Sequence, residues 1–183
     1  MSGLVVDVSE LIARPGVPAG GRKVIRRGVA LPGLRGALGW LGESDVVELD
    51  LVADGVTDGI VVGGTLSGTM HLSCSRCLVT FDQAFRQPVD EWFGFAGSGN
   101  DGEDEGYEVR DDRIDLEPLV RDVIVLAIPT RPLHDEACQG LCPTCGGDRN
   151  VVDCGHSQKL EDLRWAPLDA LRALGELGME RSS

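Results

Sequence analysis

Six cysteines carry the strongest chemical signal in this 183-residue sequence. Two pairs have the spacing C-x2-C, Cys74 with Cys77 and Cys142 with Cys145, and Gly146 follows the second pair. Thiolates at this spacing can point at one ion when the turn between them is tight. Two such half-sites supply the four ligands of a tetrahedral structural zinc. The sequence therefore predicts zinc binding.

Six cysteines and two of the three histidines make eight ligands, enough for two tetrahedral sites. The later site would be a local unit, C-x2-C-x8-C-x-H. The earlier site would join the first pair to a segment about sixty residues further on, where a metal closes a long loop. A single ion remains an alternative, in which the first pair shares the later site or stays free. The predicted ligand sets are Cys74, Cys77, His134 and Cys138, and Cys142, Cys145, Cys154 and His156.

Other chemistry could use the same residues. Some cysteines could be ordinary buried small hydrophobic residues. The pair Cys142 and Cys145 could act in thiol redox chemistry, although no helix is expected straight after it, as a thioredoxin-like order would require. His134 and Glu136 before this pair are similar to the zinc deaminase pattern. In that pattern, however, a proline precedes the first cysteine and the two halves lie on separate helices, which six residues cannot provide. His71 is expected to be a strand side chain.

The charge distribution limits which kind of partner the protein can be expected to bind. The net charge is −13, yet residues 1–40 hold six basic and two acidic residues, so the acidic excess lies in the remainder. A broad acidic surface repels phosphate and attracts a basic partner, such as a ribosomal protein. The basic residues Arg22, Lys23, Arg26 and Arg27, together with Arg76, could alternatively contact RNA, or they could form a solvated strand or tail.

The chain shows no sign of membrane insertion or of small-molecule catalysis. It has no apolar run near twenty residues, and its first thirteen residues lack the basic start of a signal peptide. Cysteine pairs in such a chain indicate reduced thiols in the cytoplasm. No phosphate loop, dinucleotide fingerprint or Ser/His/Asp order appears, so we expect neither an enzyme nor a small-molecule substrate.

Alternating apolar residues predict strands over 46–53, 59–73 and 78–91, with the first cysteine pair at a hairpin tip. Gly63 and Gly64 suggest a bulge or bend in the second strand.

The remainder is expected to be loop and helix. Residues 97–106 read as an acidic loop, and Asp115 is expected to cap a helix that ends near Ala127. A final helix should begin near Pro167, with an apolar stripe at Leu168, Leu171, Leu174 and Leu177.

The predicted fold class is α+β. It combines an antiparallel sheet, barrel-like or open, with one central helix, a zinc-binding C-terminal segment and a final helix. We divide the chain into an N-terminal segment with the basic cluster (1–45), a sheet-plus-helix core (46–133) and a zinc-knuckle segment with the C-terminal helix (134–183). The last part is expected to form one domain with the core.

Four stretches resemble the YceD family, the large ribosomal RNA subunit accumulation proteins of bacteria and plastids. The C-x-R-C and C-x-G-L-C-P-x-C-G motifs are specific, and the resemblance extends from about Val46 to Leu174. The matching stretches are 72–78, 126–129, 138–146 and 162–168.

This resemblance implies a cytoplasmic, non-enzymatic factor of ribosome biogenesis, needed for normal accumulation of large-subunit ribosomal RNA. It implies a pre-ribosomal partner on the large subunit, either a basic ribosomal protein or the RNA. Some relatives have cysteine where this chain has His134 and His156, an exchange that zinc tolerates. The alternative function is a thiol-based redox or zinc sensor. The cysteines carried over from the family are Cys74, Cys77, Cys138, Cys142, Cys145 and Cys154.

Overall fold

The computed structural model describes residues 4–12, 20–95 and 106–156, which are mostly β-sheet with one helix. The chain divides into two compact units, Met1–Cys138 and Gln139–Ser183. The divisions that we place after residues 45 and 133 stay predictions. The predicted acidic loop, apart from Gly106, and the final helix lie outside the described residues. Among those that are described, no helix has the length and apolar character needed to cross a membrane.

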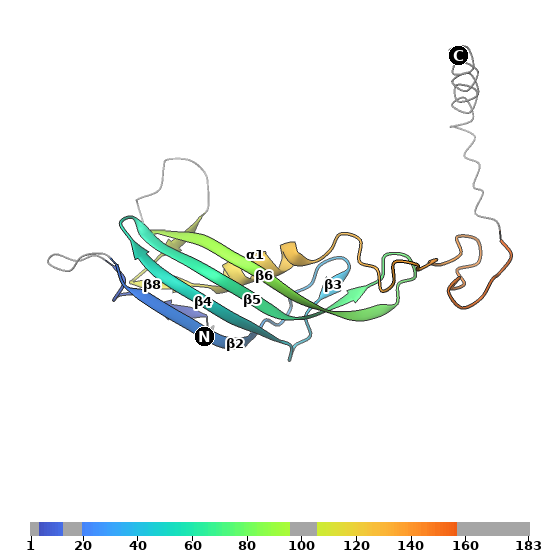
Figure 1. Ribbon diagram of the computed structural model, residues 1–183, viewed down its shortest axis with the longest axis horizontal. Coiled ribbons are helices and arrows are strands. Elements are labelled where there is room, and N and C mark those ends of the chain that lie inside the picture. The colour runs from blue at the N-terminus through green and yellow to red at the C-terminus, as the bar shows by residue number, and fades with distance from the viewer. Residues whose placement is uncertain (1–3, 13–19, 96–105, 157–183) are drawn as a thin grey trace, which may run out of the picture. The chain divides into compact units, whose positions relative to one another are not determined.

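The first unit is built on an open sheet with the strand order β2-β4-β5-β6-β7 (Figure 1). Neighbouring strands are antiparallel except β6 and β7, which are parallel, and β3 pairs with β5 beside this path. The outer strands β2 and β7 do not pair with each other, so the sheet is open rather than barrel-like. Its strands are β2 (Arg22–Ala30), β3 (Gly39–Trp40), β4 (Val46–Val56), β5 (Gly59–Ser73), β6 (Thr80–Phe95) and β7 (Tyr107–Val109).

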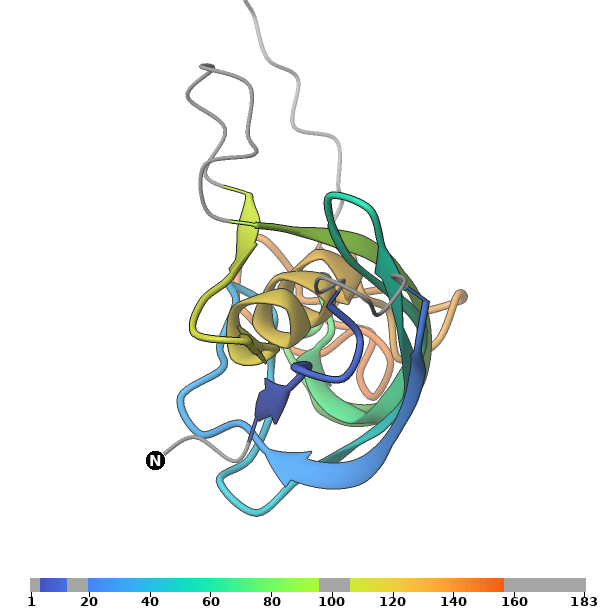
Figure 2. The same ribbon diagram turned by 90° about the vertical axis from the view of Figure 1, so that its left-hand side faces the viewer.

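A second, two-stranded sheet joins the chain's beginning to the segment before the helix. It pairs β1 (Val5–Asp7) with β8 (Arg113–Asp115) in antiparallel register. Strand β8 leads into the helix α1 (Glu117–Ala127), and the large sheet curves around this helix (Figure 2).

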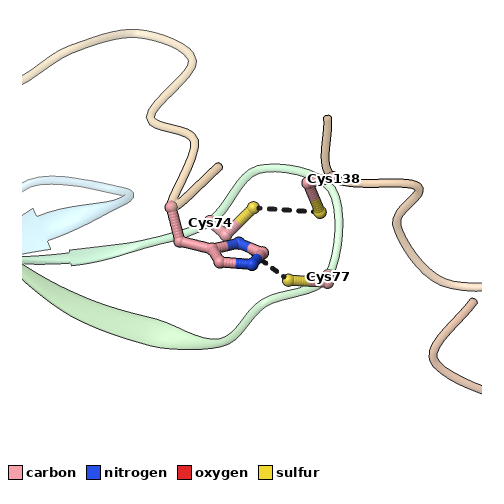
Figure 3. A group of neighbouring side chains, drawn as sticks. Cys74, Cys77 and Cys138 are labelled. Carbon is pink, nitrogen blue, oxygen red and sulfur yellow. Dashed lines mark hydrogen bonds between the residues drawn. The ribbon is translucent and has the colours of Figure 1, made fainter. Parts of the chain in front are cut away.

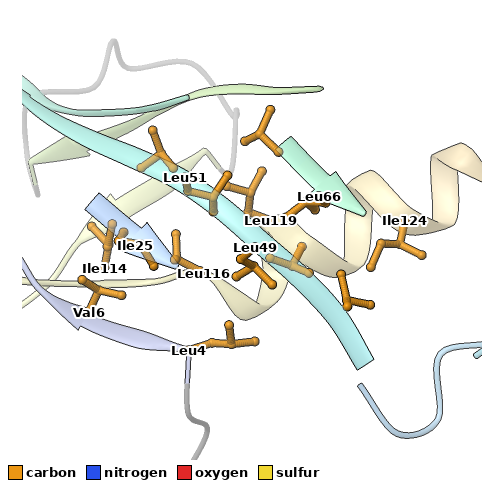
Figure 4. Close-up of a cluster of buried hydrophobic side chains, with 14 of the residues drawn as sticks. Leu4, Val6, Ile25, Leu49, Leu51, Leu66, Ile114, Leu116, Leu119 and Ile124 are labelled. Atoms are coloured by element: carbon orange, nitrogen blue, oxygen red, sulfur yellow. The ribbon is translucent and has the colours of Figure 1, made fainter. Parts of the chain in front are cut away.

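Alternation in the sequence decides which face of the sheet is buried. In β4 the side chains of Leu49 and Leu51 are at most 2% exposed, whereas those of Glu48, before Leu49, and Asp50, between the two leucines, are exposed. Successive residues of a strand point to opposite faces, so one face of the sheet is apolar. Leu116, Leu119 and Ile124, from the helix and its N-terminal end, pack onto this face in one core (Figure 4).

The helix starts later than the sequence predicts. Asp115 belongs to β8, and the residue at the N-cap is Leu116, which is fully buried. Asp115 still satisfies one of the open backbone donors, because its Oδ1 accepts the N–H of Glu117 at 2.9 Å. Asp115 therefore still caps the helix in part, from the position before the N-cap residue Leu116.

Gly63 and Gly64 do not form the predicted bulge, because the register of β5 with β4 and β6 runs through them without a skipped residue. Gly64 has φ +144°, and a Cβ there would lie 2.2 Å from the carbonyl oxygen of Asp50. The glycine at position 64 is therefore explained by close approach of the neighbouring strand rather than by a bulge.

The described part of the second unit, residues 139–156, contains neither a helix nor a strand. Its turns are held by local bonds, such as the N–H of Arg149 to the carbonyl of Gly140 at 3.0 Å. Val151 and Val152 are 78% and 59% exposed, and among the described residues of this unit only Cys142 is a buried hydrophobic residue. Burial of apolar surface therefore supplies little of the stability of this segment.

Candidate metal centres

The structure gathers the eight predicted ligands into two groups of four. One group contains Cys74, Cys77, His134 and Cys138, and the other contains Cys142, Cys145, Cys154 and His156. Within each group, one ligand atom from every residue lies within 4.8 Å of the others. The residues are grouped in space as in the two predicted ligand sets, and each cluster could hold a metal ion. We call them centre 1 and centre 2.

Centre 1 lies at the tip of the β5–β6 hairpin, where Cys74 and Cys77 face Cys138 from the segment after α1 (Figure 3). The hairpin turn is closed by two backbone bonds. Cys74 donates its N–H to the carbonyl of Val79 at 2.8 Å, and Leu78 donates to the carbonyl of Cys74 at 2.9 Å. Because the turn is tight, both thiols project from the same side of the hairpin tip.

The distances in centre 1 match those of a tetrahedral ion. The Sγ atoms of Cys74 and Cys138 are 3.8 Å apart, and Cys77 Sγ is 3.4 Å from His134 Nδ1. Bond lengths typical of zinc would place two sulfurs about 3.8 Å apart and a sulfur about 3.6 Å from a nitrogen. All six cysteines are free thiols. The residues therefore fit a four-coordinate metal.

The surroundings of centre 1 favour ionisation of one thiol, that of Cys74. Burial opposes ionisation of Cys74, but hydrogen bonds from the His134 side chain and from the backbone of Cys77, His134 and Arg76 outweigh it and lower its pKa to about 5. Burial raises the pKa of Cys77 to about 11, and hydrogen bonding with Cys74 and Cys138 adds to this. A metal is bound by thiolates, so its binding would release protons from this cluster.

Centre 2 repeats the same turn in the second unit. Cys142 donates its N–H to the carbonyl of Gly147 at 2.8 Å, and Gly146 donates to the carbonyl of Cys142 at 2.8 Å. Cys142 Sγ lies 3.7 Å from His156 Nδ1, again close to a tetrahedral edge. Backbone hydrogen bonds from Cys145 and Thr144 lower the pKa of Cys142 to about 6.

The two centres differ in their surroundings. In centre 1 all three cysteines are buried, and only His134 is exposed. In centre 2 Cys145 and His156 are exposed and Cys154 is half-buried. Solvent and chelators therefore reach the ligands of centre 2 more readily.

Several residues of the basic cluster have partners within the first unit, and Arg22 lies toward the opposite end of β5 from Arg76. Arg22 pairs with Asp54 and Arg26 with Asp50, each at 2.8 Å, on the neighbouring strand β4. Lys23 donates to the carbonyl of Asp7 at 2.8 Å. Asp54 is in register with Val61 near the start of β5, whereas Arg76 follows the end of that strand.

The side chain of His71 makes contacts that its position in the sequence did not predict. It is a strand side chain on β5, as expected, and both of its ring nitrogens contact carboxylates. Nδ1 lies 2.6 Å from Asp82 and Nε2 lies 2.9 Å from Asp45. Its hydrogen bond with Asp82 raises the pKa of His71, against the effect of burial and with further help from Asp45. Neither metal cluster includes it.

Comparison with known proteins places these residues in a family. The family model described as large ribosomal RNA subunit accumulation protein YceD matches residues 62–172, which include both centres. An uncharacterized protein of Mycobacterium tuberculosis is 31% identical over 170 residues, covering 91% of this chain and 80% of that protein. The uncharacterized protein YlbN of Bacillus subtilis is 34% identical over 108 residues, covering 58% of this chain and 63% of that protein.

A relative with a descriptive name comes from a plant. The protein named large ribosomal RNA subunit accumulation protein YCED homolog 1, chloroplastic, of Arabidopsis thaliana is 27% identical over 142 residues, covering 60% of this chain and 43% of that protein. No solved structure matches significantly. Because the family model spans more than half of the chain and the mycobacterial relative is matched along most of its length, the chain belongs to the family of the large ribosomal RNA subunit accumulation protein YceD.

Proposed function

We propose that the protein is a zinc-stabilised, non-enzymatic factor of ribosome biogenesis that supports accumulation of large-subunit ribosomal RNA in the cytoplasm. The observation that carries this proposal is the presence of two Cys3His clusters within the stretch matched by the family model. Soft thiolates combined with imidazole suit zinc, whereas calcium and magnesium require oxygen ligands. The family name supplies the link to ribosomal RNA.

The zinc ions would be structural. Each cluster offers four protein ligands, which is the closed arrangement of a structural site, whereas a catalytic zinc keeps one position for water or substrate. In centre 1 the ion would join the β5–β6 hairpin to the segment after α1. In centre 2 it would replace the apolar core that the described residues of that unit lack.

We further propose that the partner on the pre-ribosomal large subunit is a basic ribosomal protein. The net charge of −13 favours a cationic partner over phosphate. Two of the arginines that could have contacted RNA, Arg22 and Arg26, are ion-paired with Asp54 and Asp50. Binding through opposite charges would weaken as salt is raised.

A pull-down from cell lysate, with and without ribonuclease, tests this partner. A basic ribosomal protein that survives ribonuclease treatment and is released by salt would support the proposal. Precursor RNA that is lost together with all proteins on ribonuclease treatment would indicate direct RNA binding instead. In that case, reversing the charge of Arg22, Lys23, Arg26 and Arg27 should abolish recovery of the RNA. Unchanged recovery in this variant would exclude the basic cluster as the RNA contact.

Native mass spectrometry tests the metal. Two zinc ions per chain would support the proposal. One ion would leave one cluster without its proposed role, and none would contradict structural zinc altogether.

A thiol-based sensor is the second candidate, and centre 2 favours it. Cys145 is exposed, and hydrogen bonds lower the pKa of its buried neighbour Cys142 to about 6, so an accessible thiol lies beside one that ionises readily. Alkylation of the native, zinc-loaded protein separates the two functions. Protection of all six cysteines until a chelator is added would support structural zinc, whereas rapid modification of Cys142 or Cys145 in the loaded protein would support a sensor.

A further inference from the structure

Arg76 links the two halves of centre 1 although it is not a ligand. It lies in the sequence between the ligands Cys74 and Cys77, on the hairpin side of the cluster. Its Nη1 donates to the carbonyl oxygen of Cys138 at 2.7 Å and to that of Glu136 at 3.2 Å. The guanidinium therefore contacts the backbone of a ligand that belongs to the opposite half.

A backbone bond reinforces this link. Ser75, the neighbour of Arg76 in the turn, donates its N–H to the carbonyl of Pro132 at 2.8 Å. The bonds from the Arg76 guanidinium and from the Ser75 N–H to these carbonyls involve neither a thiol nor an imidazole, so they do not depend on a bound ion. They hold the segment 132–138 against the hairpin tip and fix the position of Cys138.

Centre 1 needs such a link because of its long loop. Its two halves lie 57 residues apart from Cys77 to His134 and 64 apart from Cys74 to Cys138. Bringing distant segments together costs chain entropy, and a contact made before the ion binds reduces the cost left for the metal. In centre 2, Cys142 and His156 are only 14 residues apart. There, Thr144 stands where centre 1 has Arg76.

The charge of the metal-loaded site gives a second reason for a cation beside centre 1. Three thiolates exceed the charge of a divalent ion by one, so a Cys3His site with zinc is anionic when its imidazole is neutral. A cation on the backbone of Cys138 offsets this excess, and groups that orient the ligands commonly affect metal affinity by about 10- to 100-fold.

We propose that Arg76 is a positioning residue of centre 1, which preorganises Cys138 for the ion and stabilises the anionic metal complex. This inference rests on the proposed metal binding and assigns Arg76 a role other than contact with RNA.

The test compares Arg76→Gln and Arg76→Lys with Arg22→Gln, a control that removes an exposed arginine from an ion pair on β2. Each full-length, zinc-loaded protein is exposed to a chelator and then alkylated, and peptide mass mapping separates the cysteines of the two centres. In Arg76→Gln we expect the cysteines of centre 1 to be released at about 10- to 100-fold lower chelator concentration. Centre 2 should respond as in the wild type. Lys retains the charge and can donate hydrogen bonds but lacks the planar guanidinium, so Arg76→Lys should restore part of the difference.

A spectroscopic measurement excludes a merely structural role. With cobalt in place of zinc, Arg76→Gln should shift the visible bands of centre 1 at temperatures where the fold is intact. Release of centre 1 at the wild-type chelator concentration would overturn the proposal. Equal sensitisation of both centres would also overturn it, because it would indicate global destabilisation. A wild-type protein that binds no metal would instead contradict the proposed function, which distinguishes the two failures.

Discussion

Leu78 and Gly146 occupy the same position in two copies of one turn. Each follows the second cysteine of a C-x2-C pair, has a positive φ (64° and 73°), and donates its N–H to the carbonyl of the first cysteine (2.9 and 2.8 Å). The backbone of the two metal centres is therefore alike where their sequences differ. Glycine adopts this conformation readily, whereas leucine does so at a cost.

We predict that Leu78→Gly stabilises the hairpin tip by up to about 1 kcal/mol, because the strain at positive φ is removed. Leu78 is 61% exposed, so little burial is lost. Denaturant unfolding of the zinc-loaded protein measures the change. In the reciprocal variant, Gly146→Ala, the added Cβ would have no other atom within 4 Å, so this variant tests the backbone effect alone. It should make centre 2 lose its ion about 5-fold more readily. Destabilisation by Leu78→Gly would show that the leucine side chain contributes a contact of its own.

Gly64→Ala should destabilise the sheet by about 2–4 kcal/mol, because it combines backbone strain with overpacking. The added Cβ would lie 2.2 Å from the carbonyl oxygen of Asp50, and Gly64 has a positive φ. Gly63→Ala is the matched control, since its Cβ would approach nothing closer than 3.8 Å. Thermal denaturation of both variants provides the comparison. Similar melting temperatures for the two would contradict the close approach of β4 and β5 at Gly64.

Removing one ligand from each centre should have unequal effects. Cys138→Ser should lose one ion and destabilise the first unit by more than about 4 kcal/mol, because it opens a centre joined to the sheet. Cys154→Ser should also lose one ion, but the main unfolding transition should stay within about 0.5 kcal/mol of the wild type. Native mass spectrometry counts the ions, and calorimetry follows the transition. A large shift in Cys154→Ser would mean that centre 2 supports the sheet.

His71 should make the stability of the first unit depend on pH. Both ring nitrogens contact carboxylates, which requires the protonated ring and raises its pKa in the folded state. A raised folded pKa gives a contribution that is complete below the unfolded value of about 6.5 and is lost as pH rises through the folded value.

His71→Gln should therefore reduce stability more at pH 6 than at pH 9, relative to wild type at each pH. Denaturant unfolding at both values checks the sign, and Asp90→Asn, on the same strand as Asp82, serves as the control. A constant difference between wild type and His71→Gln across this range would show that the ring does not titrate as the contacts require.

The grouping of cysteines and histidines into two clusters that could hold a metal could be predicted in part from the sequence, because it depends on spacing. Cys142, Cys145, Cys154 and His156 lie within one short segment, so local chain geometry determines their meeting. The strand over 59–73 was also predictable, since Val62, Leu66, Met70 and Leu72 share one face, and β5 has these bounds.

Other features depend on contacts that spacing does not encode. The close approach at Gly64 arises from the neighbouring strand and not from the Gly-Gly pair itself. The bonds of Arg76 to the carbonyls of Glu136 and Cys138 form only after the chain has returned to the hairpin tip. Likewise, the ion pairs of Arg22 and Arg26 with β4 follow from strand order, which charge counts alone do not give.

The long loop closed by centre 1 has a consequence for the order of folding. Between Cys77 and His134 lie strand β6, the β7–β8 region and the helix α1. Bringing the four ligands together costs less chain entropy once these elements have docked, so we expect tight metal retention at this centre to appear last during folding. Tight binding of an ion at centre 1 would therefore indicate that the core has assembled. A chain with a misplaced helix would differ from it by lacking the ion at the hairpin tip.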